Sequence, residues 1–286
     1  MDKKKLEKII KCVAAVAALF MFVVAVVWTM DYDKGTDDTY DVVFMGDSNL
    51  GNTRNETGIV PLLEKKTGKK ILNGSFGGSM MKSLYGKKTE YQSSLSMYNM
   101  AVSICNRNFG MQKSAIDTLA RTDYIGYFSE TMDKLSEVDF DTVEILIIEH
   151  GVNDFLAGTP IKNDEDLYDI NTFSGTLRTI VVMLREEYPD LRLILVTPSY
   201  CAPLRIDGLN YPCDKYAYGG GYLEEYVNAE LEVAQELDVE IIDVYHGIDM
   251  DETNFSTYLY DGLHYNEAGR EAVADMIADY LLGEAK

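Results

Sequence analysis

Residues 143–149 read VEILIIE, and residues 150–154, which follow at once, read HGVND. A short and nearly continuous apolar run of this kind is typical of a strand that is buried on both faces of a sheet. Four other runs rich in β-branched residues have the same character: Asp41–Met45, Lys70–Asn73, Arg192–Thr197 and Val239–Val244. The sequence therefore predicts five buried strands.

Stretches with helical periodicity lie between and after these runs, at Thr176–Tyr188, Tyr222–Leu237 and Asn266–Leu282. Strands that alternate with helices predict right-handed crossovers and a parallel sheet covered by helices on both faces. The expected fold class is α/β, a three-layer α/β/α sandwich with a five-stranded parallel sheet in flavodoxin-like order. In such sheets functional groups gather at the carboxyl ends of the strands.

The first thirty residues differ in composition from the rest of the chain. Five lysines precede an uncharged apolar run from Cys12 to Trp28, and acidic residues follow it. We expect residues 1–11 to be a cytoplasmic basic segment, residues 12–30 an uncleaved transmembrane signal anchor and residues 31–40 a polar tether. The charge distribution then places a single domain, residues 41–286, outside the cytoplasm. A cleaved signal peptide, which would give a secreted protein, is the competing interpretation.

The net charge of the chain excludes one class of partner. Without the five lysines and two acidic residues of positions 1–30, the totals of 26 basic and 47 acidic residues leave a net charge of −24. A surface of this sign repels phosphate backbones, so we expect no nucleic-acid partner. The only membrane contact that we expect is through the N-terminal helix.

Two cysteines stand twelve residues apart in a stretch rich in Gly, Pro and Tyr. They are Cys201 and Cys213, and they belong to a domain that we expect to be exported. A disulfide bridge and two free thiols are both compatible with this spacing.

Polar blocks follow several of the expected strands, where one sheet edge would bring them together. Gly46-Asp47-Ser48 follows the first run and can present a serine hydroxyl above that edge. A glycine loop at residues 73–79 follows the second run, and Gly151-Val152-Asn153-Asp154 follows the third. Near the carboxyl end, Asp261-Gly262-Leu263-His264 brings a carboxylate close to an imidazole. Singly, each block also suits an ordinary turn or helix cap.

Together, the order and spacing of these blocks resemble the four signature blocks of the SGNH/GDSL hydrolases. The resemblance implies the SGNH hydrolase fold, with Ser48 as nucleophile, His264 as general acid and base, and Asp261 as the residue that orients the histidine. It also implies an oxyanion hole formed by the backbone N–H groups of Ser48 and Gly78 and by the side chain of Asn153. No metal and no cofactor are expected.

Some positions depart from the family pattern or offer rival bases. Asn49 stands where the GDSL motif has leucine, and Tyr265 stands where proline often follows the histidine. Neither change removes a reacting group, so both bear on subfamily and substrate. Of the two other histidines, we expect His246 to be structural, because no carboxylate stands in a recognisable triad pattern beside it. His150 precedes the Gly151-x-Asn153-Asp154 block and could line the pocket, but the sequence assigns it no catalytic role.

The segment between the second and third runs is about seventy residues long, although a crossover with its helix needs only about ten to twelve. This segment and the one after the fourth run are rich in aromatic residues, which we expect to wall a cleft. Packing within a loop-rich cap is the alternative. Tyrosines present flat apolar faces with a polar tip, which suits sugar rings or aromatic acyl groups. The residues are Tyr85, Tyr91, Tyr98, Phe109, Tyr124, Tyr127 and Phe128, then Tyr200, Tyr211, Tyr216, Tyr218 and Tyr222.

Three functions remain open on these grounds. The first is an extracytoplasmic serine esterase that removes small acyl groups, such as O-acetyl, from an acylated glycan of the cell envelope or from extracellular polysaccharide. The second is an O-acyltransferase of the same fold acting on cell-wall polymer. The third is a catalytically inactive binding module, which the intact set of reactive residues disfavours. The sequence does not specify the oligomeric state.

Overall fold

The computed structural model of the protein describes residues 39–83, 90–119 and 125–284. Its core is one parallel sheet of five strands: β1 (Val42–Met45), β2 (Ile71–Asn73), β3 (Ile145–Glu149), β4 (Arg192–Val196) and β5 (Glu240–Ile242). The strand order is β2-β1-β3-β4-β5, with parallel pairing throughout. This is the flavodoxin-like order, so the predicted sheet is confirmed.

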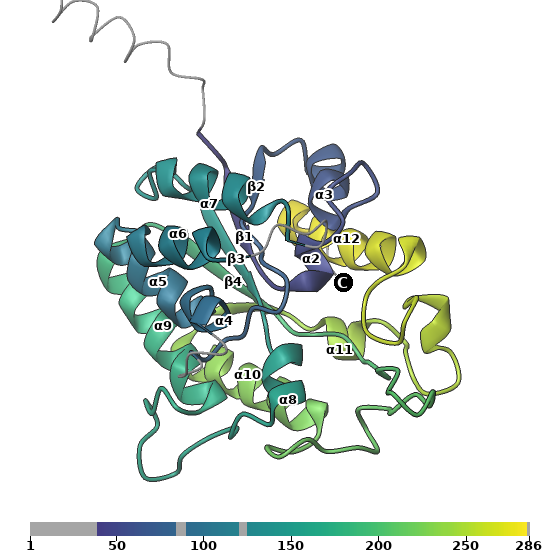
Figure 1. Cartoon of the computed structure of the whole chain (residues 1–286). Coiled ribbons are helices and arrows are strands. Elements are labelled where there is room, and N and C mark those ends of the chain that lie inside the picture. The colour runs from purple at the N-terminus through teal and green to yellow at the C-terminus, as the bar shows by residue number, and fades with distance from the viewer. Residues whose placement is uncertain (1–38, 84–89, 120–124, 285–286) are drawn as a thin grey trace, which may run out of the picture. The chain divides into compact units, whose positions relative to one another are not determined.

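Helices cover both faces of the sheet (Figure 1). On one face α3 (Ile59–Thr67) packs against α12 (Glu267–Leu282). On the other face α9 (Phe173–Glu187) packs between α5 (Met97–Asn106) and α10 (Leu223–Leu237). The predicted three-layer sandwich is therefore confirmed. All five residues of β3 are buried, as its unbroken apolar run predicts.

Capping residues mark the starts of α9 and α12 and the end of α12. Thr172 accepts a hydrogen bond from the backbone N–H of Gly175 at the start of α9, and Asn266 accepts one from Gly269 at the start of α12. Helix α12 ends at Gly283, which has a left-handed φ of 73°. The remaining helices are α2 (Ser48–Gly51), α4 (Glu90–Ser94), α6 (Gly110–Asp117), α7 (Phe128–Glu137), α8 (Val152–Ala157), α11 (Val244–Gly247) and a 3₁₀ turn at Phe255–Thr257.

The described parts of the long crossover between β2 and β3 form helices. They contain α4 to α7, of which α5 lies against α9 and α6 against α7 (Figure 1). Phe109 and Phe128 are buried, and Phe128 packs edge-to-face on Phe76 with ring centroids 5.2 Å apart. The expectation that this segment's aromatic residues line a cleft is wrong for these two phenylalanines, because their rings belong to the core. Tyr85 and Tyr124 lie outside the described residues.

The expected basic segment, the anchor and most of the tether fall on residues 1–38, which lie outside the described ranges. Residues from Thr39 to the carboxyl end form one compact unit. Within the described part of the chain, no helix combines the length and the apolar character that crossing a bilayer requires.

The two cysteines of interest lie side by side without a bridge. Cys201 and Cys213 are both buried free thiols, and the backbone N–H of Cys201 points at the sulfur of Cys213, 3.4 Å away. Of the two alternatives that the spacing left open, the structure has the free thiols.

Candidate active site

The polar blocks meet at the carboxyl ends of β1, β2 and β3, because the strands are parallel and adjacent. Ser48 opens the short helix α2 directly after β1. The carboxylate of Asp47 caps this helix by accepting the backbone N–H of Asn49 at 2.8 Å. Ser48 is thereby fixed at the sheet edge, where 6% of its surface is exposed.

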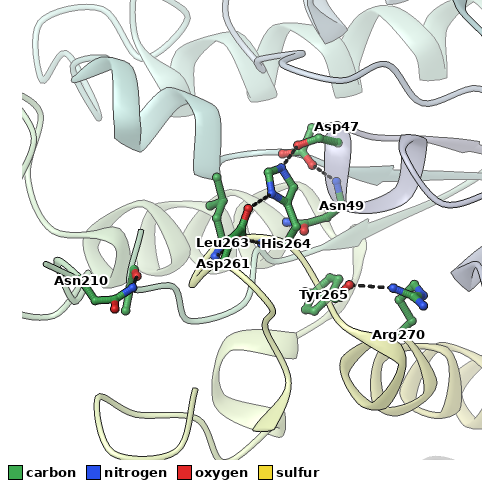
Figure 2. A network of polar contacts seen from close by, with 10 residues as sticks. Asp47, Asn49, Asn210, Asp261, Leu263, His264, Tyr265 and Arg270 are labelled. Atoms are coloured by element: carbon green, nitrogen blue, oxygen red, sulfur yellow. Dashed lines mark hydrogen bonds and ion pairs between the residues drawn. The ribbon is translucent and has the colours of Figure 1, made fainter. Parts of the chain in front are cut away.

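A continuous line of hydrogen bonds joins three of the predicted residues. The Oγ atom of Ser48 lies 3.0 Å from Nε2 of His264, and Nδ1 of His264 lies 2.7 Å from Oδ2 of Asp261. Figure 2 shows the imidazole between Asp261 and the loop that carries Asp47 and Asn49. These distances are those required of a nucleophile, a base and the residue that orients the base.

The carboxyl group of Asp261 is held in its charged form. Burial raises its pKa, but hydrogen bonds from the backbone N–H and imidazole of His264 and from the N–H of Leu263 outweigh burial and leave the pKa below its usual value. An ionised Asp261 keeps the proton of His264 on Nδ1. The lone pair of Nε2 then faces Ser48, as a general base requires.

Two backbone N–H groups near Ser48 are available to a ligand oxygen. Among the described residues, neither the N–H of Ser48 nor that of Gly78 donates a hydrogen bond. Gly78 has a φ of 76°, a conformation that favours glycine. Among the described residues, the nearest neighbour of a Cβ atom at this position would be the side-chain nitrogen of Gln92, at 3.8 Å. The described part of the chain therefore leaves room beside Gly78.

The backbone of the glycine loop is hydrogen-bonded to an arginine, Arg54, which the sequence analysis did not identify. The guanidinium of Arg54 donates to the carbonyl groups of Gly51, Asn73 and Ser75 and stacks over the ring of Tyr127, 4.1 Å from its centroid. The Tyr127 hydroxyl accepts the N–H of Gly77 at 2.9 Å. No motif marks Arg54, because its partners are backbone carbonyls.

The predicted oxyanion donor Asn153 is engaged in the resting structure. Its Nδ2 group donates to Oδ2 of Asp47 at 2.9 Å and to the carbonyl oxygen of Ser79 at 3.0 Å. Both hydrogens of the carboxamide are therefore in use. A substrate oxygen can be bound by Asn153 only if one of these hydrogen bonds is shared or released.

Three carboxyl groups of the strand ends are buried: Asp47, Glu149 and Asp154. Burial raises the pKa of Asp47 to about 6 and that of Asp154 to about 7. Burial, with the nearby Asp47 and Glu230, also raises the pKa of Glu149 well above its usual value. Among the described residues, neither oxygen of Glu149 has a hydrogen-bond partner.

A second serine and histidine pair lies deeper in the protein. Oγ of Ser79 is 3.0 Å from Nε2 of His150, and both residues are buried. The Ser79 hydroxyl must donate its one hydrogen to the carbonyl of Leu95, 2.7 Å away, so Nε2 of His150 is the donor in this pair. Nδ1 of His150 has no partner in the described part of the chain, and the carboxylate of Asp154 instead accepts the N–H groups of Met81 and Lys82. His150 is therefore not placed to deprotonate Ser79.

The expectation that no carboxylate accompanies His246 is wrong. Asp243 stands three residues before it, its Oδ2 lies 2.7 Å from Nδ1 of His246, and its Oδ1 accepts the backbone N–H of the same histidine. The spacing Asp-x-x-His, visible in the sequence, could have identified the pair. Among the described residues no serine hydroxyl reaches Nε2, and the nearest carboxylate oxygen belongs to Glu224 at 3.8 Å.

The segment after β4 braces the turn that carries the triad. We call residues 202–210 the brace loop. The N–H of Ala202 donates to the carbonyl of Gly262 at 2.6 Å, and the side chain of Asn210 returns a hydrogen bond to the carbonyl of Ala202 at 2.6 Å (Figure 2). Gly262 has a φ of 79°, and a Cβ there would collide with that carbonyl oxygen. Leu204, Ile206 and Leu209 project from the loop as exposed apolar residues.

Aromatic residues of this second segment divide between core and surface. Tyr200 is buried and donates to Asp214, whereas Tyr216 and Tyr222 are exposed. Outside the predicted set, the ring of Tyr260 stacks on that of His264 with centroids 5.7 Å apart. In the described part of the chain, no group of three or more His, Cys, Asp or Glu side chains could hold a metal ion.

The chain is similar to proteins named as lipases, acylhydrolases and esterases. The profile of the GDSL-like lipase/acylhydrolase family matches residues 76–272, a range that includes Asp261 and His264 and begins after Ser48. The isoamyl acetate-hydrolyzing esterase 1 homolog of Bos taurus is 32% identical over 136 residues, which are 46% of this chain and 53% of that protein. The chain thus spans about half the length of the curated relatives it matches.

Solved structures share the fold at low sequence identity. A possible lipase from Chitinophaga pinensis superposes with a TM-score of 0.55 at 18% identity and covers 85% of this chain and 99% of its own. Est24, a carbohydrate acetylesterase from Sinorhizobium meliloti, superposes with a TM-score of 0.54 at 16% identity over 85% of this chain and 98% of its own.

Proposed function

Because the chain belongs to the GDSL-like lipase/acylhydrolase family, we propose that it is a serine esterase with Ser48, His264 and Asp261 as its catalytic triad. The observation that carries this proposal is the unbroken line from Ser48 Oγ through the imidazole to Asp261, with distances of 3.0 and 2.7 Å. The exposed fraction of the His264 side chain, 19%, gives a substrate access to the imidazole. A binding module would have no need of this alignment.

The geometry supports a two-step acyl transfer. Nε2 of His264 takes the proton of Ser48 while Oγ attacks the ester carbonyl, and the imidazolium is stabilised by Asp261. The oxyanion accepts hydrogen bonds from the backbone N–H groups of Ser48 and Gly78. Asn153 adds a third by sharing one of its side-chain hydrogens. His264 then protonates the departing alcohol. Water, deprotonated by the same histidine, resolves the acyl-enzyme and releases the acid.

The substrate that we propose is an acetyl ester on an envelope or extracellular polysaccharide. The names of the similar proteins refer to isoamyl acetate and to carbohydrate acetyl groups, both of which are acetyl esters. The exposed rings of Tyr216, Tyr222 and Tyr260 offer flat surfaces that suit sugar rings. The strong negative charge of the chain disfavours phosphorylated polymers.

We also propose that the domain works outside the cytoplasm, held by residues 12–30. The support is the order of lysines, apolar run and acidic residues in the sequence. Protease added to intact cells should digest the chain from Asp31 onward and spare the lysine-rich start. Digestion only after the cells are permeabilised would reverse this orientation.

Mass spectrometry of the full-length chain after incubation with an aryl acetate tests the activity. We expect an acetyl adduct on Ser48 and steady release of acetate, with both lost in Ser48→Ala. Adding an acetyl-free glycan shows how much of the acetyl group goes to water and how much to sugar. Hydrolysis that persists in Ser48→Ala, or an adduct on Ser79, would refute the proposed triad.

A further inference from the structure

One buried side chain of the serine block has contacts that the two-step mechanism leaves unused. Asp47 is fully buried, and its two oxygens have different partners. Oδ1 accepts the backbone N–H of Asn49 at 2.8 Å, and Oδ2 accepts Nδ2 of Asn153 at 2.9 Å. The carboxylate therefore ties the turn of the nucleophile to the side chain of the oxyanion donor, across the boundary between β1 and β3.

The two hydrogen bonds of Asn153 differ in strength. The bond to Asp47 is charge-assisted, whereas the bond to the carbonyl of Ser79 joins neutral groups. When negative charge develops on a substrate oxygen, the weaker bond is the one that yields. Asp47 then keeps the carboxamide in place while its second hydrogen turns to the oxyanion.

The neighbour of Asp47 allows it to carry this charge. Because Met45 pairs with Ile148 in the sheet, the next residues along, Gly46 and Glu149, lie opposite each other. A Cβ on Gly46 would be 3.2 Å from a carboxyl oxygen of Glu149. Burial and the charge of the nearby Asp47 raise the pKa of Glu149 well above its usual value. Of the two carboxyl groups, Glu149 therefore keeps its proton, and Asp47 carries the charge.

We propose that Asp47 is a positioning residue, whose carboxylate orients the Asn153 carboxamide for the oxyanion and whose protonation releases it. This inference rests on the proposed esterase activity for its consequence but not for its geometry. The titratable groups that face Asp47 are His264, Glu149 and Tyr265, and Glu230 lies beyond Glu149. Protonation of Asp47 therefore adds a loss of activity of its own as the pH falls.

A kinetic test uses Asp47→Asn. Its carboxamide can satisfy Asn49 with one oxygen but then turns an N–H₂ group toward the N–H₂ group of Asn153, which displaces it. We expect kcat for an aryl acetate to fall by about tenfold to a hundredfold with little change in KM. In an Asn153→Ala background the same substitution should cost less than about threefold, because its target is gone. Losses that multiply in the double variant would overturn the proposal.

Two further measurements separate positioning from a general loss of structure. The ratio of kcat in the unaltered chain to kcat in Asp47→Asn should fall as the pH decreases, with a midpoint near pH 6. A ratio that stays constant between pH 5 and pH 8 would refute the release step. The control Glu149→Gln preserves an uncharged neighbour and should stay within about threefold of the parent at pH 7. A loss as large as that of Asp47→Asn would show that Glu149 carries the charge instead.

A spectroscopic test is independent of activity. In the full-length chain labelled with ¹⁵N-asparagine, the side-chain amide signal of Asn153, identified by its absence in Asn153→Ala, should titrate with a midpoint near pH 6. It should not do so in Asp47→Asn. A titrating signal in a chain that hydrolyses no ester would refute the proposed function and leave the Asp47 contact standing. A signal that does not move between pH 5 and pH 8 would refute the contact itself.

Discussion

Two turns of this protein share the spacing Asp-x-x-His, and only one of them faces a serine. In the turns Asp243–His246 and Asp261–His264, the carboxylate binds Nδ1 at 2.7 Å and accepts the backbone N–H of the same histidine. They differ at Nε2, which meets Ser48 at 3.0 Å in the second turn and a Glu224 oxygen at 3.8 Å in the first. An oriented histidine is thus a local property of four residues, whereas a nucleophile beside it depends on the whole sheet.

The pair of Ser79 and His150 shows the opposite case, a histidine that contacts a serine but, in the described part of the chain, not an orienting carboxylate. Here a serine lies 3.0 Å from an imidazole, but no carboxylate of the described residues binds Nδ1, and burial lowers the pKa of His150 to about 3. The protein contains three histidines, and each shows a different subset of the triad contacts. Only His264 has both, which is why we assign the chemistry to it.

The largest effect should come from exchanging the histidines. His264→Ala removes the base and should lower kcat by about 10⁴-fold or more, because a triad works as a unit. His246→Ala, the matched control from the similar turn, should remain within about twofold of the parent. Steady-state rates on one aryl acetate decide the comparison. A large loss in the control would mean that the wrong turn has been assigned to catalysis.

The next largest effect should appear at Asn153. Asn153→Ala should lower turnover by about 10²–10³, because the carboxamide strengthens its contact only as charge develops on the substrate oxygen. The melting temperature should change little by comparison. Near-normal turnover in a well-folded variant would restrict the oxyanion hole to the two backbone N–H groups.

A third substitution should reverse this pattern. Ser79→Ala leaves the buried N–H of His150 without an acceptor, so the free energy of unfolding should fall by about 1–3 kcal/mol. Turnover per folded molecule should stay within about threefold, because the Ser79 carbonyl that meets Asn153 belongs to the backbone. Urea unfolding and active-site titration measure the two quantities. Loss of turnover without loss of stability would give the buried pair a catalytic role.

The last effect, on the free energy of unfolding, concerns pH and the buried carboxyl groups. Asp47 and Asp154 have folded-state pKa values raised to about 6 and about 7, so both bind protons more tightly when folded. Their stabilising contribution is complete below the unfolded pKa and is lost as the pH rises through the folded values. Each group can change the free energy of unfolding by up to about 1.4 kcal/mol per pH unit in that window. Urea unfolding should therefore show greater stability at pH 5 than at pH 8, and the opposite trend would contradict the assigned burial.

The sequence predicts the sheet well because its strands are buried on both faces and read as uninterrupted apolar runs, as in β3. It also predicts the contact between Asp261 and His264, because the two residues are neighbours in the chain. It does not reveal Arg54, whose three partners are backbone carbonyls, or Glu149, which differs from an ordinary strand-end residue only by what surrounds it. It leaves the role of the aromatic residues in the long crossover open, because a tyrosine or phenylalanine suits a core as well as a cleft; Phe109 and Phe128 belong to the core.

The brace loop has a consequence for how this chain can diversify. The same nine residues, 202–210, present exposed apolar side chains to solvent and hold the Gly262 turn through the backbone of Ala202. The surface of the loop and the alignment of His264 therefore depend on one segment. Side-chain exchanges at Ile206 or Leu209 alter that surface alone, whereas insertions, deletions or loop transplants shift the support of His264 as well. Recombination with a relative should preserve activity only when the brace loop and the turn around Gly262 travel as one unit.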